Sequence, residues 1–466
     1  MSSTETLLSM PVAISANRLM HHVRILAAPD MRGRMPGDIG YELASRHVES
    51  EFSRLGLKPL GDSGAFRQHF PLETNRIARA EVRFHAPDGR IHPLNLGVDF
   101  ICRGLTDGAR IRAPLTFVGY GRQDGPGDEL AVDLTGRIAL DFKHPAPFAK
   151  DKPQELPRAR GRQYQEKGAI GLAVLHNPNH PDPDRLSASL MEDSQPLPGF
   201  PMIVLSSAFG MSLFSGPPDS LASRQYRIDC LGEVASGAVA GELEIDIEAA
   251  PDRNGTCWNV IGVLEGSDPE RSDEAIVIGA HLDHVGIQGE SVIFHGAQDD
   301  ASGVSALLEI AAELSRRPHP RTIIFIAFGA EETGIVGSLY YGAHPPWPLE
   351  RTVGMYNLDC MGAGIGLDTR GRKHHPDFFT TWDDLNARFF RIPDTCADHV
   401  AGGADAEAFQ RAGVTNMFIV AKQPYQHLHM VSDTPETLNP VVFEAITRLT
   451  CMTVETQAHA VKRSHS

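Results

Sequence analysis

The stretch AIVIGAHLDHVG, residues 275–286, indicates the fold class of this chain. Ala275–Ala280 is a short, continuous run of apolar and small residues, as expected of a strand that is buried on both faces of a parallel sheet. The run leads directly into His281 and Asp283. Because ligands of open α/β sheets bind outside the carboxyl ends of the strands, these two residues are candidates for a functional site.

Similar apolar runs recur beyond residue 240, and helical patterns lie between them and near the start of the chain. The runs are Trp258–Leu264, Thr322–Phe328, Thr352–Leu358 and Val414–Val420, and the helical patterns are Asn17–Ala28, Tyr41–Leu55 and Val304–Leu314. Buried strands that alternate with amphipathic helices predict an α/β fold with a mixed, mostly parallel central sheet flanked by helices.

Composition narrows the class of partner. The 466 residues include 43 Lys and Arg against 59 Asp and Glu, a net charge of −16, which is the wrong sign for binding nucleic acid or an anionic membrane surface. The six cysteines form no C-x-x-C pair, and no apolar run approaches the roughly 20 residues of a membrane helix. The first 20 residues lack a secretory signal pattern, so we expect a cytoplasmic protein, with its oligomeric state open.

Acidic residues and histidines follow the other predicted strands as well. Glu331 and Glu332 come after Thr322–Phe328, Asp359 follows Thr352–Leu358, and His429 lies beyond Val414–Val420. Asp299 and Asp300 precede the Val304 helix, where free N–H groups favour carboxylates. A hydrolytic metal pair requires such a set: oxygen and nitrogen ligands from several strands, one carboxylate that bridges two ions, and a carboxyl group that serves as base.

Each of these residues also has a plainer interpretation. An Asp-Asp pair before a helix is usually an N-cap, adjacent glutamates usually form a solvated turn, and a lone histidine is usually a surface or core residue. The coincidence of so many ligand types at strand ends favours the metal site, since independent structural roles would not require it.

The motifs that carry these residues resemble the co-catalytic zinc aminopeptidases of peptidase family M28. They are AIVIGAHLDHVG, GAQDDASGVSALLEIA (296–311), IIFIAFGAEETGIVGS (323–338), YNLDCMG (356–362) and HLHMVSDTPETL (427–438). LAAPDMRGRMPGDIGYELASRHVESEFSRLGLKPLG (26–61) also resembles that family, so the similarity spans nearly the whole chain. The set is specific, whereas GAEE or HLD alone would be weak.

The resemblance implies a role for each matching residue. Asp299 takes the place of the carboxylate that bridges two zinc ions, His281 and Asp359 complete one ion, and Glu332 and His429 complete the other. Glu331 takes the place of the general base, and Asp283 would orient His281. The implied reaction is hydrolysis of the N-terminal peptide bond of a peptide with a free N-terminus, by a hydroxide that bridges the two ions. Histidine and carboxylate ligands also accept Co²⁺ or Mn²⁺.

The resemblance also implies the domain organisation. Residues 112–226 contain short apolar runs separated by connections rich in Pro, Asp and Lys, which is typical of a compact, mostly-β insert. We expect residues 1–110 to form the N-terminal part of the catalytic domain, residues 111–235 an inserted protease-associated (PA) domain, and residues 236–466 the metal-binding part.

Two observations leave alternatives open. The family commonly has an S-D-H motif where this chain has Ala404-Asp405-Ala406, so other residues are needed to hold the oxyanion; Tyr425 and His427 are candidates, with ordinary loop roles as the alternative. Glutaminyl-cyclase-like acyltransferases share the fold but use one zinc, and some relatives are non-catalytic interaction proteins. The complete ligand set and Glu331 argue against both alternatives.

Overall fold

The computed structural model describes residues 12–104, 106–123, 127–147, 157–180, 186–190, 197–396, 404–422 and 425–460. Met1–Leu72, Asn254–Gly286 and Phe294–Ser466 form one compact unit, and Glu73–Arg253 with Ile287–Ile293 forms a second. The predicted insert, residues 111–235, lies inside the second unit, whose limits are wider. Its identity as a PA domain stays a prediction. Residues 1–11, which contribute to the expectation about localisation, lie outside the described residues.

The first unit is built on a mixed sheet, as predicted. In spatial order its strands are β1 (Lys58–Pro59), β11 (Thr256–Leu264), β15 (Thr322–Phe328), β12 (Ala275–His281), β16 (Thr352–Leu358) and β17 (Asn416–Ile419), and β2 (Arg67–Pro71) also pairs with β11. The four strands from β15 to β17 are parallel, whereas β11 runs antiparallel to β15. The last strand is shorter than the predicted run of residues 414–420.

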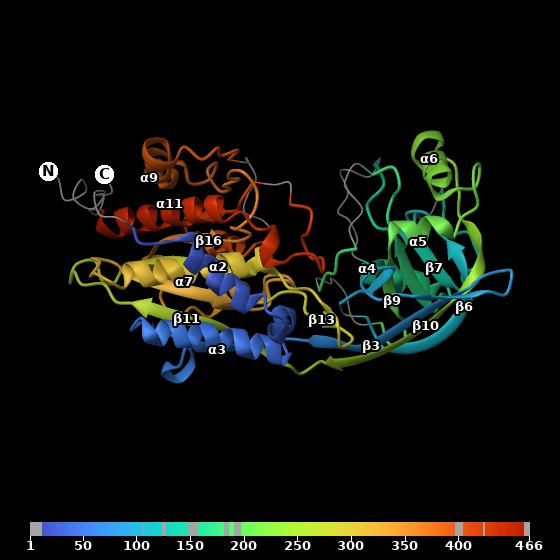
Figure 1. Cartoon of the computed structure of the whole chain (residues 1–466), viewed down its shortest axis with the longest axis horizontal. Helices are drawn as coiled ribbons and strands as arrows, with labels where there is room; N and C mark the ends of the chain where they lie inside the picture. Colours follow the sequence, from blue (N-terminus) through green and yellow to red (C-terminus); the bar gives the residue numbers. More distant parts are fainter. Residues whose placement is uncertain are drawn as a thin grey trace. The chain divides into compact units, whose positions relative to one another are not determined.

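Helices cover both faces of this sheet. Ile276 and Ile278 of β12 pack into a core with α2 (Ala16–Leu26), α3 (Ile39–Arg54), α7 (Ser302–Leu314), α9 (Pro376–Leu385) and α11 (Pro440–His459). Figure 1 shows α11, α7 and α3 one above another beside the strands of this sheet. Val277 points to the opposite face, where α8 (Val336–Ala343) and α10 (Ala406–Arg411) pack. Because successive side chains alternate across a strand, burial on both faces explains the continuous apolar run.

The register of the parallel strands brings their carboxyl ends to one edge. His281, the last residue of β12, pairs with Phe328, the last residue of β15, and Gly279 pairs with Asn357 near the end of β16. The residues that follow these strands therefore emerge together, as the sequence predicts. This edge carries the candidate site.

The second unit is a ten-stranded sheet with short helices. Its strands are β3 (Thr74–His85), β4 (Ile91–Leu94), β5 (Phe100–Cys102), β6 (Ala109–Phe117), β7 (Ile138–Phe142), β8 (Gly171–Leu175), β9 (Met202–Leu205), β10 (Gly237–Asp252), β13 (Ile287–Gln288) and β14 (Val292–Ile293). The helices are α4 (Pro157–Glu166), α5 (Ser207–Ser212) and α6 (Leu221–Leu231). Strands β6 to β9 are parallel, and β7, β8 and β9 are buried along their whole length. No helix among the described residues is long and apolar enough to cross a membrane.

Candidate metal centre

The five predicted ligands come together at the carboxyl edge of the first sheet. His281 ends β12, Asp359 directly follows β16, and Glu332 lies in the loop after β15. His429 lies in the loop after β17, and Asp299 lies in the turn that leads into α7. Residues from four strands and one helix start are therefore neighbours, although 148 positions separate the first from the last (429 − 281).

Asp299 lies between two groups of ligands. Its Oδ1 is 3.0 Å from His281 Nε2, whereas its Oδ2 is 2.9 Å from His429 Nε2. Asp359 Oδ1 lies 3.8 Å from His281 Nε2, and Glu332 Oε2 lies 3.1 Å from His429 Nε2. One carboxylate thus faces both groups with a separate oxygen, which is the arrangement expected of a bridging ligand.

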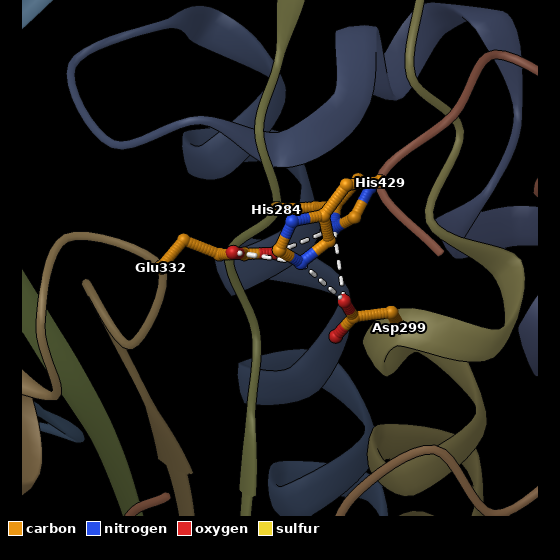
Figure 2. Close-up of side chains that lie close together, drawn as sticks. All are labelled: His284, Asp299, Glu332 and His429. Atoms are coloured by element: carbon orange, nitrogen blue, oxygen red, sulfur yellow. Dashed lines mark ion pairs between the residues drawn. The ribbon is translucent and has the colours of Figure 1, made fainter. Parts of the chain in front are cut away.

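His284 is a further member of the second group. Figure 2 shows its ring with Asp299, Glu332 and His429, all four directed toward one another. His284 Nδ1 lies 2.8 Å from Glu332 Oε1, an ion-pair distance. The sequence places His284 in the same HLDH stretch as His281, but nothing in its spacing distinguishes a ligand from a neighbour of a ligand, so it is not among the five predicted ligands.

The donor atoms of this site fit divalent cations. His284, Glu332 and Asp299 are buried, yet both ring nitrogens of His284 and Oε1 of Glu332 have no hydrogen-bond partner of acceptable geometry. Leaving such atoms unpaired costs about 1–3 kcal/mol each, unless another group satisfies them. Imidazole nitrogens and carboxylate oxygens are the ligands that zinc prefers in sites of this composition. The structure thus supports metal binding at this edge of the sheet.

The pKa values of the adjacent residues Glu331 and Glu332 are shifted in opposite directions. Burial raises the pKa of Glu331 well above its ordinary value, and the charge of Glu332 adds to this effect. Burial also acts on Glu332, but the nearby imidazoles of His429 and His284 outweigh it and lower its pKa to about 2. Two neighbouring carboxyls with divergent proton affinities are typical of a ligand and a proton carrier. The assignment of Glu331 as the base and Glu332 as a ligand stays a prediction.

The structure differs from the prediction for Asp283. The ring of His281 is oriented by the main chain, since its Nδ1 lies 3.2 Å from the Asp283 carbonyl oxygen, whereas the closest carboxylate oxygen is 3.9 Å away. The Asp283 carboxylate instead accepts hydrogen bonds from the backbone N–H groups of Glu331 and Glu332. It therefore positions the loop that carries both glutamates.

The sequence leaves two interpretations open for Asp299 and Asp300, an N-cap and a metal ligand. The two residues make different contacts in the structure. The Asp300 carboxylate accepts hydrogen bonds from Gly303 N at 2.8 Å and Cys360 N at 3.0 Å. It thus caps the start of α7 and joins it to the end of β16, which is a structural role. Asp299 faces the histidines. The contacts of Asp300 match the structural interpretation, and the ligand interpretation of Asp299 stays a prediction.

Arg34 binds backbone carbonyl groups next to the predicted ligands. The sequence alone does not predict this role. Its fully buried guanidinium donates to the carbonyl oxygens of Leu282, Gly296 and Asp299, among others. Gly33 makes this possible, because a Cβ there would overlap the carbonyl oxygens of the 286–294 region. The RGR triplet has no local pattern that distinguishes it from an exposed turn, so only the fold identifies this role.

Asp433 is a second residue that the sequence-based prediction missed. Its carboxylate accepts from the backbone N–H groups of Gln298 and Asp299 and from the hydroxyl of Tyr425. The Tyr425 hydroxyl also lies 2.8 Å from Thr437 Oγ1, so it is engaged in holding Asp433. His427 Nδ1 lies 2.9 Å from Ser432 Oγ. These contacts favour the loop interpretation of both oxyanion candidates.

An α/β sheet whose strand ends carry two ligand groups with one shared carboxylate is typical of metal-dependent hydrolases. Residues 259–454 match the family model described as peptidase family M28. Aminopeptidase YwaD of Bacillus subtilis (strain 168) is 28% identical over 197 residues, which make up 40% of this chain and 40% of that protein. The matched stretch is thus less than half the length of that relative.

Solved structures show the same fold over nearly the whole chain. BSAP, a zinc aminopeptidase from Bacillus subtilis, superposes with a TM-score of 0.68 at 18% identity and covers 98% of both chains. An aminopeptidase from Aneurinibacillus sp. strain AM-1 superposes with a TM-score of 0.62 at 19% identity and covers 95% of this chain and 93% of its own. Both likenesses include the second unit.

Proposed function

We propose that this chain is a metal-dependent aminopeptidase that uses two bound zinc ions to hydrolyse the N-terminal bond of peptides. The observation that carries the proposal is the position of Asp299, whose two oxygens face separate ligand groups at 3.0 and 2.9 Å. Relatives named as aminopeptidases support the reaction class. A single-zinc enzyme would require only one of the two groups.

The proposed ligands would be divided between the two zinc ions. His281 and Asp359 would hold one zinc, Glu332 and His429 the other, and Asp299 both. When bound, zinc lowers the pKa of water and polarises the carbonyl of the scissile bond. Co²⁺ or Mn²⁺ would also suit these ligands.

Glu331 would carry the proton. Burial favours its protonated form, so once it has accepted a proton from the attacking water it can retain that proton until the leaving nitrogen takes it. The hydrogen bond from its backbone N–H to Asp283 fixes the loop at this position. General acid-base catalysis of this kind contributes roughly 10²–10⁴-fold to the rate.

The test is a panel of aminoacyl p-nitroanilides, assayed with the whole chain before chelation, after chelation and after addition of zinc. We expect cleavage that chelation abolishes and zinc restores, with about two zinc ions per chain required for full activity. N-acetylated versions of the same substrates serve as controls and should resist cleavage. Activity that survives complete metal removal, or equal cleavage of the acetylated substrates, would contradict the proposal.

The variant Glu331→Gln separates catalysis from metal binding. It keeps the size of the side chain but removes the proton acceptor, so we expect turnover to fall about 10³-fold or more while both zinc ions remain bound. Metal content measured by mass spectrometry on the same sample checks the second point. Full turnover in Glu331→Gln would remove the general base from the proposal, whereas one zinc per wild-type chain would favour a cyclase-like enzyme.

A further inference from the structure

A second cluster of metal-binding side chains lies at the opposite end of the first sheet. Glu455 and His459 occupy the last turns of α11, four residues apart and therefore on one face of the helix. His319 lies in the connection between α7 and β15. Since β15 spans 7 residues, this cluster and the centre at its carboxyl end are about 20 Å apart. The two sites share no residue.

The ligand atoms of this cluster converge. One nitrogen from each histidine and one oxygen of Glu455 all lie within 4.8 Å of one another. The two imidazole rings have centroids 5.5 Å apart and are inclined at 77°. In tetrahedral zinc sites with bonds of about 2.0 Å, neighbouring ligand atoms are about 3.3 Å apart, so small rotations of these side chains would bring all three to one ion.

Each imidazole of the cluster has one buried nitrogen without a hydrogen-bond partner among the described residues. His319 is buried, and its Nε2 lies 2.7 Å from the Leu314 carbonyl oxygen, to which it donates, so that Nδ1 carries the free lone pair. His319 Nδ1 and His459 Nε2 are both buried and have no hydrogen-bond partner among the described residues.

Glu455 supplies the negative charge. It is 4% exposed, and Arg317 Nε donates to its Oε1 at 2.5 Å. Arg317 Nη1 also bonds to Glu313 at 3.3 Å, so this arginine is shared between two carboxylates. Burial of a carboxylate beside two lone pairs is favourable when a cation joins them.

We infer that His319, Glu455 and His459 bind one divalent transition-metal ion, of which Zn²⁺ is the best match for two imidazoles and a carboxylate. The ion would tie the end of α11 to the connection that precedes β15. Three protein ligands leave the fourth position of a tetrahedral site to water.

The experiment is a zinc titration of the metal-free whole chain by calorimetry, with bound zinc counted by mass spectrometry. His459→Gln is the main variant, because His459 ends its helix and is only half-buried, so the fold should survive. His92→Gln is the matched control, an exposed histidine outside both sites. We expect His459→Gln to bind one zinc ion fewer than the wild type and His92→Gln to bind the same number.

A second comparison keeps the two sites apart. In the double variant His281→Ala/His429→Ala the M28 centre is disabled, and we expect one zinc ion to remain; adding His319→Gln should remove it. Aminoacyl-p-nitroanilide hydrolysis should be retained in His459→Gln, so the result does not depend on the proposed function. Equal zinc content in the wild type and His459→Gln would overturn the inference. It would also be overturned if adding His319→Gln to the double variant left the zinc content unchanged.

Discussion

The carboxylate of Asp283 accepts a hydrogen bond from the backbone N–H of Glu331 at 3.0 Å, across 48 positions of sequence. The same carboxylate accepts from Glu332 N at 3.2 Å. One side chain at the end of β12 therefore fixes the loop after β15, which carries both the proposed base and a proposed ligand. Burial raises the pKa of Asp283 to about 6, but the carboxylate still ionises near neutral pH.

Asp283→Asn should impair catalysis through this loop. The amide keeps one acceptor oxygen but turns an N–H group toward one of the two backbone donors, so one hydrogen bond is lost and a repulsive contact replaces it. We expect kcat to fall about 10–100-fold, as for other residues that orient metal ligands, with weaker zinc binding. Steady-state kinetics and zinc titration measure both effects, and unchanged values in both would refute this role.

Asp299→Asn and Asp300→Asn should have different consequences, although the residues are adjacent. Asp299 faces both ligand groups, so its substitution should weaken zinc binding about 100-fold or more at both positions. Asp300 accepts two backbone hydrogen bonds through Oδ1 alone, and asparagine can retain that oxygen. Zinc content of the two purified variants provides the comparison; loss of both ions from Asp300→Asn would argue against a structural role.

His284→Gln tests whether the extra histidine binds metal. Its Nδ1 faces Glu332 Oε1 at 2.8 Å. If His284 only positions Glu332, glutamine can still donate to that oxygen, and zinc affinity should fall no more than about 10-fold. A larger loss with one ion missing would identify His284 as a ligand. His295→Gln is a suitable control, since His295 Nδ1 contacts the Ala27 carbonyl oxygen and belongs to neither ligand group.

Arg34→Lys should destabilise the fold and disturb the centre. The guanidinium is fully buried and bonds to several carbonyl oxygens at once, and a lysine ammonium cannot reach them in the same geometry. We expect a loss of about 2–4 kcal/mol in the free energy of unfolding, measured with urea. Arg54→Lys, at an exposed position on α3, should change it by less than about 0.5 kcal/mol. Equal effects of the two variants would be incompatible with this role.

Acid should weaken the first unit through His22. Burial, helped by His47 at 3.0 Å, lowers the pKa of His22 from 6.5 to about 4 in the folded chain. Between these values the unfolded chain binds a proton that the folded chain does not, so this part of the stability is complete above pH 6.5 and is lost as the pH falls toward 4. The loss at pH 5 is about 2 kcal/mol.

Replacing His22 isolates this effect from other groups that titrate in the same range. His22→Gln should lose less stability than the wild type between pH 7 and pH 5, as followed by urea midpoints. His21→Gln, the exposed neighbour on the same helix, should behave like the wild type. A wild-type pH dependence in His22→Gln would show that His22 is not responsible.

Local sequence patterns were sufficient to predict the α/β class and the residues at the strand ends. Ala275–Ala280 and Thr322–Phe328 are continuous apolar runs because both faces of their sheet are covered, and that property can be recognised locally. Parallel strands then bring their carboxyl ends together, so the order of strands and polar residues along the chain is enough to group His281, Asp359 and Glu332.

By contrast, only the packing of the folded chain determines which atoms of a residue form hydrogen bonds and with which partners. Arg34 and Asp433 bind backbone groups of the 282–299 region from far along the chain, and no spacing rule predicts contacts that depend on how loops fold back. The carbonyl of Asp283, and not its carboxylate, orients His281 for the same reason. A periodic pattern records which side of a strand or helix is buried, whereas the partner of a buried polar atom depends on distances that exist only after the chain has packed.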